Sequence, residues 1–166
     1  MREQLRIRSV SLRELFLPML GNWTGVEQQA ALPPPGPATS ARAMIVFKLD
    51  VGDQIVVQDY RQVSTDGAEL SGHGVFMIDV ADEAASAPQT PILWWFFDSG
   101  GRPPQPAHGA WQAGELIMLR PTPRGIAEHR FAVIDEQLSY RIRVQLDDAA
   151  EPEEFLRGTY RRISGH

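Results

Sequence analysis

The feature that most constrains this chain is a series of short apolar runs, rich in β-branched and aromatic residues, that continues from about residue 44 to residue 163. Turn signals such as "VGD" at 51–53 and "STDG" at 64–67 separate neighbouring runs. Runs of this kind at intervals of about 8–12 residues are typical of antiparallel strands joined by short turns. No helical period of convincing length follows residue 22. The pattern predicts an all-β protein.

Eight runs carry this pattern, and two shorter pieces, 23–29 and 109–111, bring the expected number of strands to about ten. The eight runs are residues 44–50, 54–63, 70–80, 92–98, 114–119, 125–134, 138–146 and 153–163. A meander of such strands either closes as a barrel or folds as a sandwich. Because closure removes the exposed edges of a sheet, we favour a closed antiparallel up-and-down barrel of about 8–10 strands over residues 21–163.

A short N-terminal helix is predicted ahead of the barrel, over about residues 11–20. Ser11 and Glu14 have the spacing of a capping box, in which each side chain satisfies a free backbone N–H group. Pro18 and Gly21 limit the length of the helix. The apolar residues that follow at helical spacing are Leu12, Leu15, Phe16 and Met19. We expect this apolar face to act as a lid or plug on the barrel.

Composition narrows the class of protein. A chain of 166 residues is predicted to form a single domain, 1–166, with a core that needs no metal or disulfide. The net charge of -5 argues against nucleic-acid binding, and the absence of cysteine excludes disulfides, thiol catalysis and thiolate metal sites. The N-terminus lacks the apolar region of a signal peptide and no later stretch is long enough to span a bilayer, so we expect a cytoplasmic protein without a membrane partner.

Three segments interrupt the strands: 31–42 and 99–109, both rich in proline, and the polar stretch 81–91. Each is predicted to be a surface loop. Such connections serve either as spacers or as the rim of a cavity, and both interpretations remain open here.

Several short motifs occur in a recognisable order: "GNWTG" (21–25), "SGHGVFMID" (71–79), "WWFFDSGG" (94–101), "HGAWQAGELIML" (108–119) and a closing "YRRI" (160–163). In this order the chain resembles the calycin-like barrels, which include lipocalins, fatty-acid-binding proteins and nitrobindins. It is most similar to a family of bacterial calycin-like domains without an assigned function, over roughly residues 20–163. The resemblance implies a barrel that encloses a small hydrophobic or amphipathic ligand.

Trp23 lies between Gly21 and Gly25 at the start of the expected barrel. In barrels of this kind the Trp of the first strand packs across the closed end, and a late arginine such as Arg162 is placed to cover its ring. The glycines permit the turn from helix to strand and a close backbone approach. We interpret Trp23 mainly as a core plug.

The stretch "ILWWFF" at 92–97 loses the alternation of a half-buried strand, so both of its faces are apolar. One face lines the barrel; the other needs a cover from the N-terminal helix or from a second subunit. Packing is the commoner role of such an aromatic stripe, and a stacking platform for a planar ligand that includes Trp95 is the alternative. We expect a homodimer that buries part of Trp94, Trp95, Phe96 and Phe97.

The run 138–146 alternates cleanly, with Tyr140 on the apolar face and Arg141 and Arg143 on the other. A core face and a solvated face is the ordinary interpretation. In the alternative, Arg141 or Arg143 enters the cavity and pairs with a carboxylate. Fatty-acid-binding proteins use an Arg-x-Tyr pair for this purpose, whereas here Tyr160 and Arg162 occur in the reversed order. The acidic residues available to pair with an internal arginine are Glu27, Glu69 and Glu128.

Histidines decide whether haem is expected. Nitrobindins hold ferric haem through a histidine near the C-terminal strands and open with G-x-W-x-G-x-G. This chain has Glu27 in place of the third glycine, and its last strand contains no histidine. His129 and His73 lie on earlier strands, where a lone histidine is more often structural than a ligand. Haem is therefore disfavoured, and no cofactor is predicted.

The sequence leaves three functions in view. We favour a binding barrel for a small, mostly apolar molecule, ahead of a ferric haem protein and of a filled barrel with a structural or protein-interaction role. Motifs of common enzymes are absent, so no catalytic residue and no metal ligand are assigned and catalysis is not assumed. The candidate cavity residues are Trp23, His73, Phe76, Trp95, His129, Tyr140, Arg141, Arg143, Tyr160 and Arg162.

Overall fold

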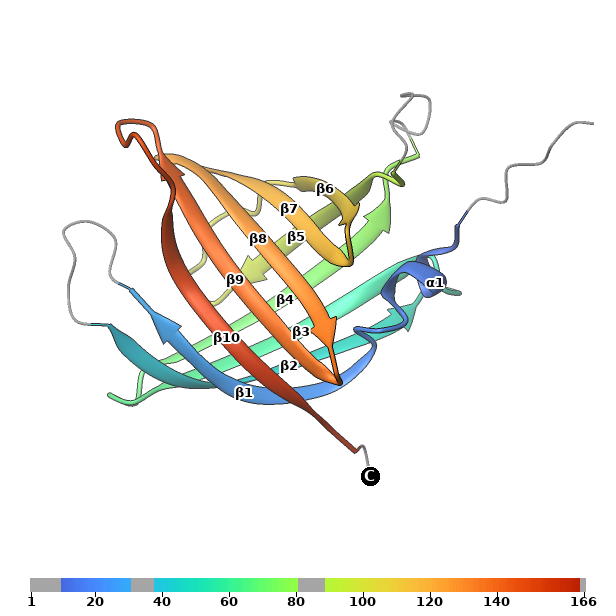
Figure 1. The fold of residues 1–166 in the computed structure, drawn as a ribbon, viewed down its shortest axis with the longest axis horizontal. Helices are drawn as coiled ribbons and strands as arrows, with labels where there is room; N and C mark the ends of the chain where they lie inside the picture. Colours follow the sequence, from blue (N-terminus) through green and yellow to red (C-terminus); the bar gives the residue numbers. More distant parts are fainter. Residues whose placement is uncertain (1–9, 31–37, 81–88, 165–166) are drawn as a thin grey trace, which may run out of the picture.

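A computed structural model describes residues 10–30, 38–80 and 89–164. Ten antiparallel strands form one sheet in which each strand pairs with the next and β1 pairs with β10, so the sheet closes on itself (Figure 1). The prediction of an all-β closed barrel with a short N-terminal helix is confirmed. None of the helices in the described part of the chain is long and apolar enough to cross a membrane.

The elements follow one another with few interruptions. They are α1 (Leu12–Phe16), β1 (Gly21–Gln29), β2 (Thr39–Asp50), β3 (Ile55–Ser64), β4 (Glu69–Ile78), β5 (Ile92–Asp98), β6 (Ala107–Gln112), β7 (Glu115–Thr122), β8 (Gly125–Ile134), β9 (Gln137–Leu146) and β10 (Glu153–Ile163). Because α1 precedes β1, the start of β1 marks the helix end of the barrel, and the end of β1 marks the opposite end.

Two of the predicted loops are shorter than expected. Residues 39–42 continue β2 and pair with the second half of β1 instead of lying in the loop 31–42. Residues 107–109 belong to β6 and pair with β5 and β7. Pairing satisfies backbone N–H and C=O groups that a loop would leave to water, which explains why the strands extend into these segments. Residues 31–37 and 81–88 of the predicted loops lie outside the described residues.

The helix α1 is shorter than predicted, at five residues. Its capping box is present as expected: the Glu14 backbone N–H donates to Ser11 Oγ at 3.2 Å, and the Ser11 N–H donates to Glu14 Oε2 at 2.9 Å. Phe16 is fully buried, with its ring centroid 5.1 Å from that of Phe76 and 5.9 Å from that of Trp111. The helix therefore plugs one end of the barrel.

Trp23 completes the closure at the helix end. Its side chain is fully buried, and its indole Nε1–H donates to the Met19 carbonyl at 2.7 Å. The Arg162 guanidinium lies 4.3 Å from the centre of the Trp23 ring and donates to the carbonyls of Pro18 and Leu20. The interpretation of Trp23 as a core plug covered by Arg162 is confirmed.

Two glycines of β4 make room for the large rings of β5 inside the barrel. A Cβ atom on Gly72 would lie 2.1 Å from the Phe96 ring, and one on Gly74 would lie 2.7 Å from Trp94 Nε1. Because Gly72 and Gly74 lack side chains, Phe96 and Trp94 can lie against the backbone of β4. Trp94 also stacks on Phe76, with ring centroids 5.3 Å apart and planes inclined by 5°.

The outer face of β5 carries the other two rings of "WWFF". Trp95 is half-buried, and Phe97 is 49% exposed. The helix does not supply the cover considered for this face, because Phe16 packs against rings inside the barrel. The homodimer over this face stays a prediction.

Candidate ligand-binding site

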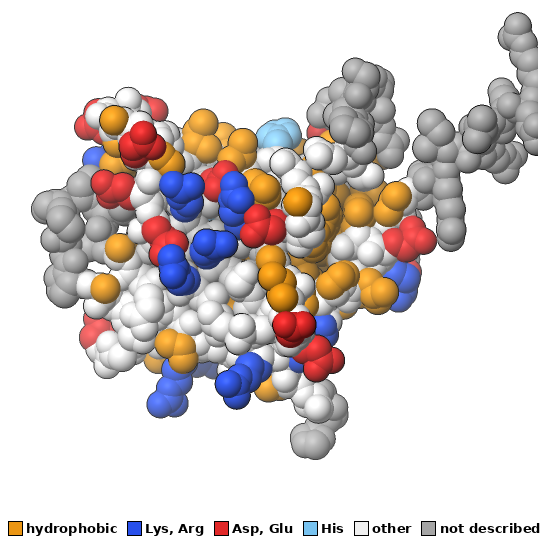
Figure 2. All heavy atoms as spheres, viewed as in Figure 1, with side chains coloured by type: hydrophobic (Ala, Val, Ile, Leu, Met, Phe, Trp, Pro, Cys, Tyr) orange, Lys and Arg blue, Asp and Glu red, His pale blue; other side chains and the backbone are white. Residues whose placement is uncertain are grey.

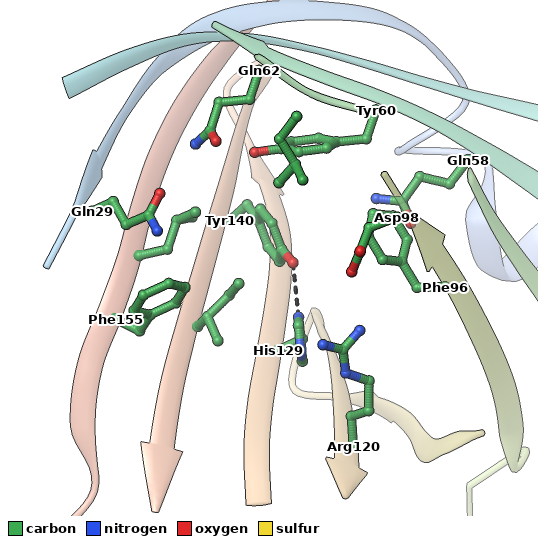
Figure 3. Close-up of a pocket in the computed structure, with 13 residues that line it drawn as sticks. Gln29, Gln58, Tyr60, Gln62, Phe96, Asp98, Arg120, His129, Tyr140 and Phe155 are labelled. Atoms are coloured by element: carbon green, nitrogen blue, oxygen red, sulfur yellow. Dashed lines mark hydrogen bonds between the residues drawn. The ribbon is translucent and has the colours of Figure 1, made fainter. Parts of the chain in front are cut away.

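A cavity of about 180 Å³ lies in the half of the barrel away from α1 (Figure 3). Its position follows from Gln29 at the end of β1, Asp98 at the end of β5 and Phe155 near the start of β10, which all line it. The rings on its walls are Tyr60, Phe96, Tyr140 and Phe155, and its polar side chains are Gln29, Gln58, Gln62, Asp98, Arg120 and His129. Inward-facing side chains fill the other half of the barrel.

His129 and Tyr140 form a buried pair on neighbouring strands β8 and β9. His129 Nδ1 and the Tyr140 hydroxyl are 2.8 Å apart, and His129 is 3% exposed. Burial, with a smaller effect of the Arg120 charge, lowers the pKa of His129 to about 3. Burial and the Glu27 carboxyl raise the pKa of Tyr140. Both side chains are therefore uncharged at neutral pH, and each offers hydrogen-bonding groups without a charge.

Glu27 is fully buried on β1, beside the cavity. Its carboxyl group accepts hydrogen bonds from the Tyr60 hydroxyl at 2.7 Å, from Gln62 Nε2 at 2.5 Å and from the Tyr160 hydroxyl. Burial raises the pKa of Glu27, and the three hydrogen bonds partly offset this effect. Sequence analysis considered Glu27 as the partner of an internal arginine, whereas the structure gives it two tyrosines and a glutamine.

Arg120 is a cavity residue that sequence analysis missed. It follows the buried Leu116 and Met118 at alternate positions of β7, so its side chain faces inward and is partly buried. The signal was the spacing of these three residues, but the expected strand 114–119 ended one residue before Arg120. Within the described residues, the Arg120 guanidinium has no hydrogen bond or ion pair.

A wider groove of about 580 Å³ continues from the cavity to the outside. The two share Leu70, Phe96, Asp98 and Arg120, which form a neck between them. The groove is further lined by Arg102, Pro103 and Pro104 of the β5–β6 connection, and by Pro121 and Pro123 next to the β7–β8 turn. Of the two interpretations of the segment 99–109, a spacer or the rim of a cavity, this geometry favours the rim.

Five of the ten candidate cavity residues are buried inside the barrel, and Arg162 is exposed at its helix end. His129 and Tyr140 line the cavity. Tyr160 lies behind the wall, bound to Glu27. Phe76 belongs to the filled core, and Trp23 and Arg162 close the helix end.

The other four candidates lie on the outer surface because of strand alternation. His73 has a 52% exposed side chain whose Nδ1 lies 2.8 Å from Asp59 Oδ1. Trp95 alternates with the inward Trp94. Arg141 and Arg143 are exposed on β9. Figure 2 shows basic and acidic side chains together on one outer face of the barrel. The ordinary interpretation of the strand 138–146, with a core face and a solvated face, is the one observed.

The described residues do not fit a haem group. His129 is the cavity histidine, but its Nε2 atom is enclosed and lacks a hydrogen-bond partner, and the Trp94 ring packs 4.8 Å from the imidazole. The cavity volume of about 180 Å³ is below the range of roughly 300–1,000 Å³ that drug-sized ligands occupy, and a porphyrin is a large ligand. The described residues also contain no group of three His, Cys, Asp or Glu side chains placed to hold a metal ion.

Comparisons with known proteins give a likeness in structure alone. No protein-family model matches the sequence, and no curated protein matches it either. The crystal structure of Rv2717c from M. tuberculosis aligns with a TM-score of 0.68 at 14% identity, over 93% of this chain and 99% of that one. The likeness is one of fold. EF1p2_mFAP2b bound to DFHBI aligns at a TM-score of 0.45 and 13% identity, over 92% of this chain and 100% of that one, which is too low a score for any inference.

Proposed function

We propose that this barrel binds one small, mostly apolar molecule in the cavity away from α1. The observation that carries the proposal is the contrast between the two halves of the barrel. Phe16 and Trp23 fill the helix end, whereas aromatic rings at the other end surround a cavity of about 180 Å³ that continues into an open groove. Concave, largely apolar sites with a few polar groups are the usual form of small-molecule sites.

The volume and the walls of the cavity limit the kind of ligand. Tyr60, Phe96, Tyr140 and Phe155 present ring faces or edges, which suits a compact aromatic body. A cavity of about 180 Å³ is small for a ligand site, so a long-chain lipid would not be enclosed.

The inner polar groups of the cavity suit hydrogen bonding without charge. Burial keeps His129 neutral and raises the pKa of Tyr60 and Tyr140 far above neutral pH. Gln58 lines the same wall and is 1% exposed. The Tyr60 hydroxyl already donates to Glu27, and His129 and Tyr140 pair with each other, so these side chains add no charge to the wall and suit an uncharged ligand body.

A filled cavity tests the proposal. Ile142 lines the cavity from β9, and Ile142→Trp would place an indole inside it; Ser139→Trp on the outer face of the same strand is the matched control. Titration of 2-naphthamide, followed by fluorescence polarisation of its naphthyl group, should show binding to the unmodified protein and to the Ser139 variant, and a loss of at least about tenfold in the Ile142 variant. Native mass spectrometry of the freshly purified protein would detect a retained ligand.

Two results would contradict this function. One is an absence of naphthamide binding to the unmodified protein together with no retained ligand. The other is equal binding by both tryptophan variants, with thermal melts showing that both are folded. Titration with hemin adds a separate check: a Soret shift that His129→Phe abolishes would show that haem occupies the barrel after all.

A further inference from the structure

We propose that the ligand of this barrel is a small aromatic carboxylic acid in its ionised form, whose carboxylate is held by Arg120 at the neck between the cavity and the outer groove. This inference rests on the proposed function and adds the chemical class of the ligand. It also sets the ligand's direction: the apolar body points inward and the carboxylate stays at the mouth.

Arg120 lies on the inner face of the barrel, near the end of β7. Strand alternation directs its side chain to the same inner face as Leu116 and Met118, and the side chain is partly buried there. Figure 3 shows it reaching from β7 into the cavity. A guanidinium group keeps its charge in any protein environment, and a charge withdrawn from water is costly unless it is paired. A partly buried guanidinium group without an ion pair is therefore suited to bind an anion.

The described groups that face Arg120 form no ion pair with it. His129 and Tyr140 are uncharged and give it no counter-charge. Asp98, on the wall of the same neck, uses Oδ1 to accept the Gly100 backbone N–H at 2.8 Å and forms no ion pair with Arg120. Among the described residues, the Arg120 guanidinium thus forms no ion pair, although the Asp98 carboxylate lines the same neck.

Arg162 differs from Arg120 in that its guanidinium group has partners within the protein. Arg162 also ends an inward-facing row, at the helix end of the barrel, but it donates to the carbonyls of Pro18 and Leu20 and lies over the Trp23 ring. These contacts explain Arg162 as a residue with a structural role. In the described part of the chain, Arg120 has no equivalent partners that would explain its position as structural.

The cavity and the outer groove meet at Arg120. Arg120 lines both, and Arg102 adds a second positive charge to the groove. A carboxylate at the neck keeps part of its hydration while it pairs with Arg120, which reduces the cost of desolvation. Planar carboxylates match the fork of N–H donors in a guanidinium group. The neutral aromatic cavity behind the neck accepts only an uncharged body.

The test compares two ligands of the same shape. 2-Naphthoate carries the carboxylate and 2-naphthamide replaces it with a neutral amide. The variants are Arg120→Met, which keeps much of the side-chain volume, and Arg124→Met, which removes an exposed arginine from the adjacent turn. We expect the unmodified protein to prefer naphthoate by at least about tenfold. Arg120→Met should weaken naphthoate binding roughly 10- to 100-fold and naphthamide binding by clearly less, because the neutral amide loses at most a hydrogen bond and not an ion pair; Arg124→Met should change neither.

The outcomes separate this inference from the proposed function. If neither naphthyl ligand binds the unmodified protein, the proposed function fails. If both bind and Arg120→Met changes neither, or weakens both equally, the Arg120 inference is overturned while the binding function stands. Thermal melts show whether the Arg120 variant is folded. A third ligand, 2-naphthyl phosphate, tests the class of anion, and tighter binding of the phosphate than of the carboxylate overturns the assignment of a carboxylic acid.

Discussion

The substitution Glu27→Gln tests the buried polar cluster that supports the cavity wall. The Glu27 carboxyl group accepts hydrogen bonds from Tyr60, Gln62 and Tyr160. A glutamine has nearly the same shape but offers one acceptor oxygen in place of two, and its NH₂ group faces donors. At least one of the three donors therefore loses part of its hydrogen bonding inside the barrel.

The expected loss of stability follows from the number of donors that Glu27→Gln leaves without a full acceptor. A buried donor without an acceptor costs about 1–3 kcal/mol, so Glu27→Gln should lower the free energy of unfolding by about that amount. For a chain of this size, each kcal/mol corresponds to about 2–4 °C in melting temperature, which predicts a fall of about 2–12 °C in the assay. Thermal and urea unfolding, followed by far-ultraviolet circular dichroism, would measure it. Glu151→Gln, at an exposed position before β10, serves as the control.

The pH dependence of this difference carries the stronger test. Burial raises the pKa of Glu27 above its ordinary value of 4.5, so the folded protein holds this proton at a pH where the unfolded chain has lost it. Stability from this group is complete below pH 4.5 and is lost as the pH rises through the folded-state pKa. The gap between the unmodified protein and Glu27→Gln should therefore narrow with rising pH. A gap that widens with rising pH, or a variant as stable as the unmodified protein at every pH, would refute the reasoning.

Two further predictions concern the two ends of the barrel. His129 has a pKa of about 3 in the folded protein against an ordinary value of 6.5, so its contribution to stability should be lost as the pH falls from 6.5 towards 3. In urea unfolding series, the difference in stability between the unmodified protein and His129→Phe should change accordingly with pH, and a difference that is constant with pH would contradict it. At the helix end, Arg162→Met should cost about 1–3 kcal/mol, because two backbone carbonyls lose a charged donor and the Trp23 ring loses its cover. Arg161→Met, at the exposed neighbouring position, should leave the melting temperature nearly unchanged, and equal effects of the two arginine variants would count against this account.

The architecture could be predicted because its signals are local and repeat along the chain. Alternation, turn residues and the capping box of Ser11 and Glu14 each state a preference of a few neighbouring residues, and all agree with one closed sheet. Strand 138–146 shows the strength of such a signal, since its alternation placed Tyr140 inward and Arg141 outward as the ordinary interpretation has it.

The site was harder to predict because a strand without alternation gives no information about which face is inside. In "ILWWFF" every position is apolar, and sequence analysis chose Trp95 as a cavity residue. The structure turns Trp94 inward, because Gly74 on the neighbouring strand leaves space for its indole and Gly72 leaves space for Phe96. The deciding residues thus lie on another strand, and their effect depends on a register that the sequence of β5 does not contain.

Arg120 could not be predicted as a cavity residue for a different reason. The sequence supported the expectation that an arginine inside the barrel would need an anion, but it offered no means of choosing among the late arginines. Arg120 was overlooked because the expected strand 114–119 ends one residue before it. β7 instead continues to Thr122, three residues further, and Pro121 pairs with Ile126 close to its end, where a missing N–H group is tolerated.

Glu27 and His129 also have a joint consequence for the whole barrel. Both are buried ionisable side chains of the same half, yet burial moves their pKa values in opposite directions, upward for the carboxyl and downward for the imidazole. Between pH 4.5 and 6.5, rising pH weakens the contribution of Glu27 while it restores that of His129. The two contributions therefore change in opposite directions with pH. Each is measured as the difference in unfolding free energy between the unmodified protein and the single variant at each pH.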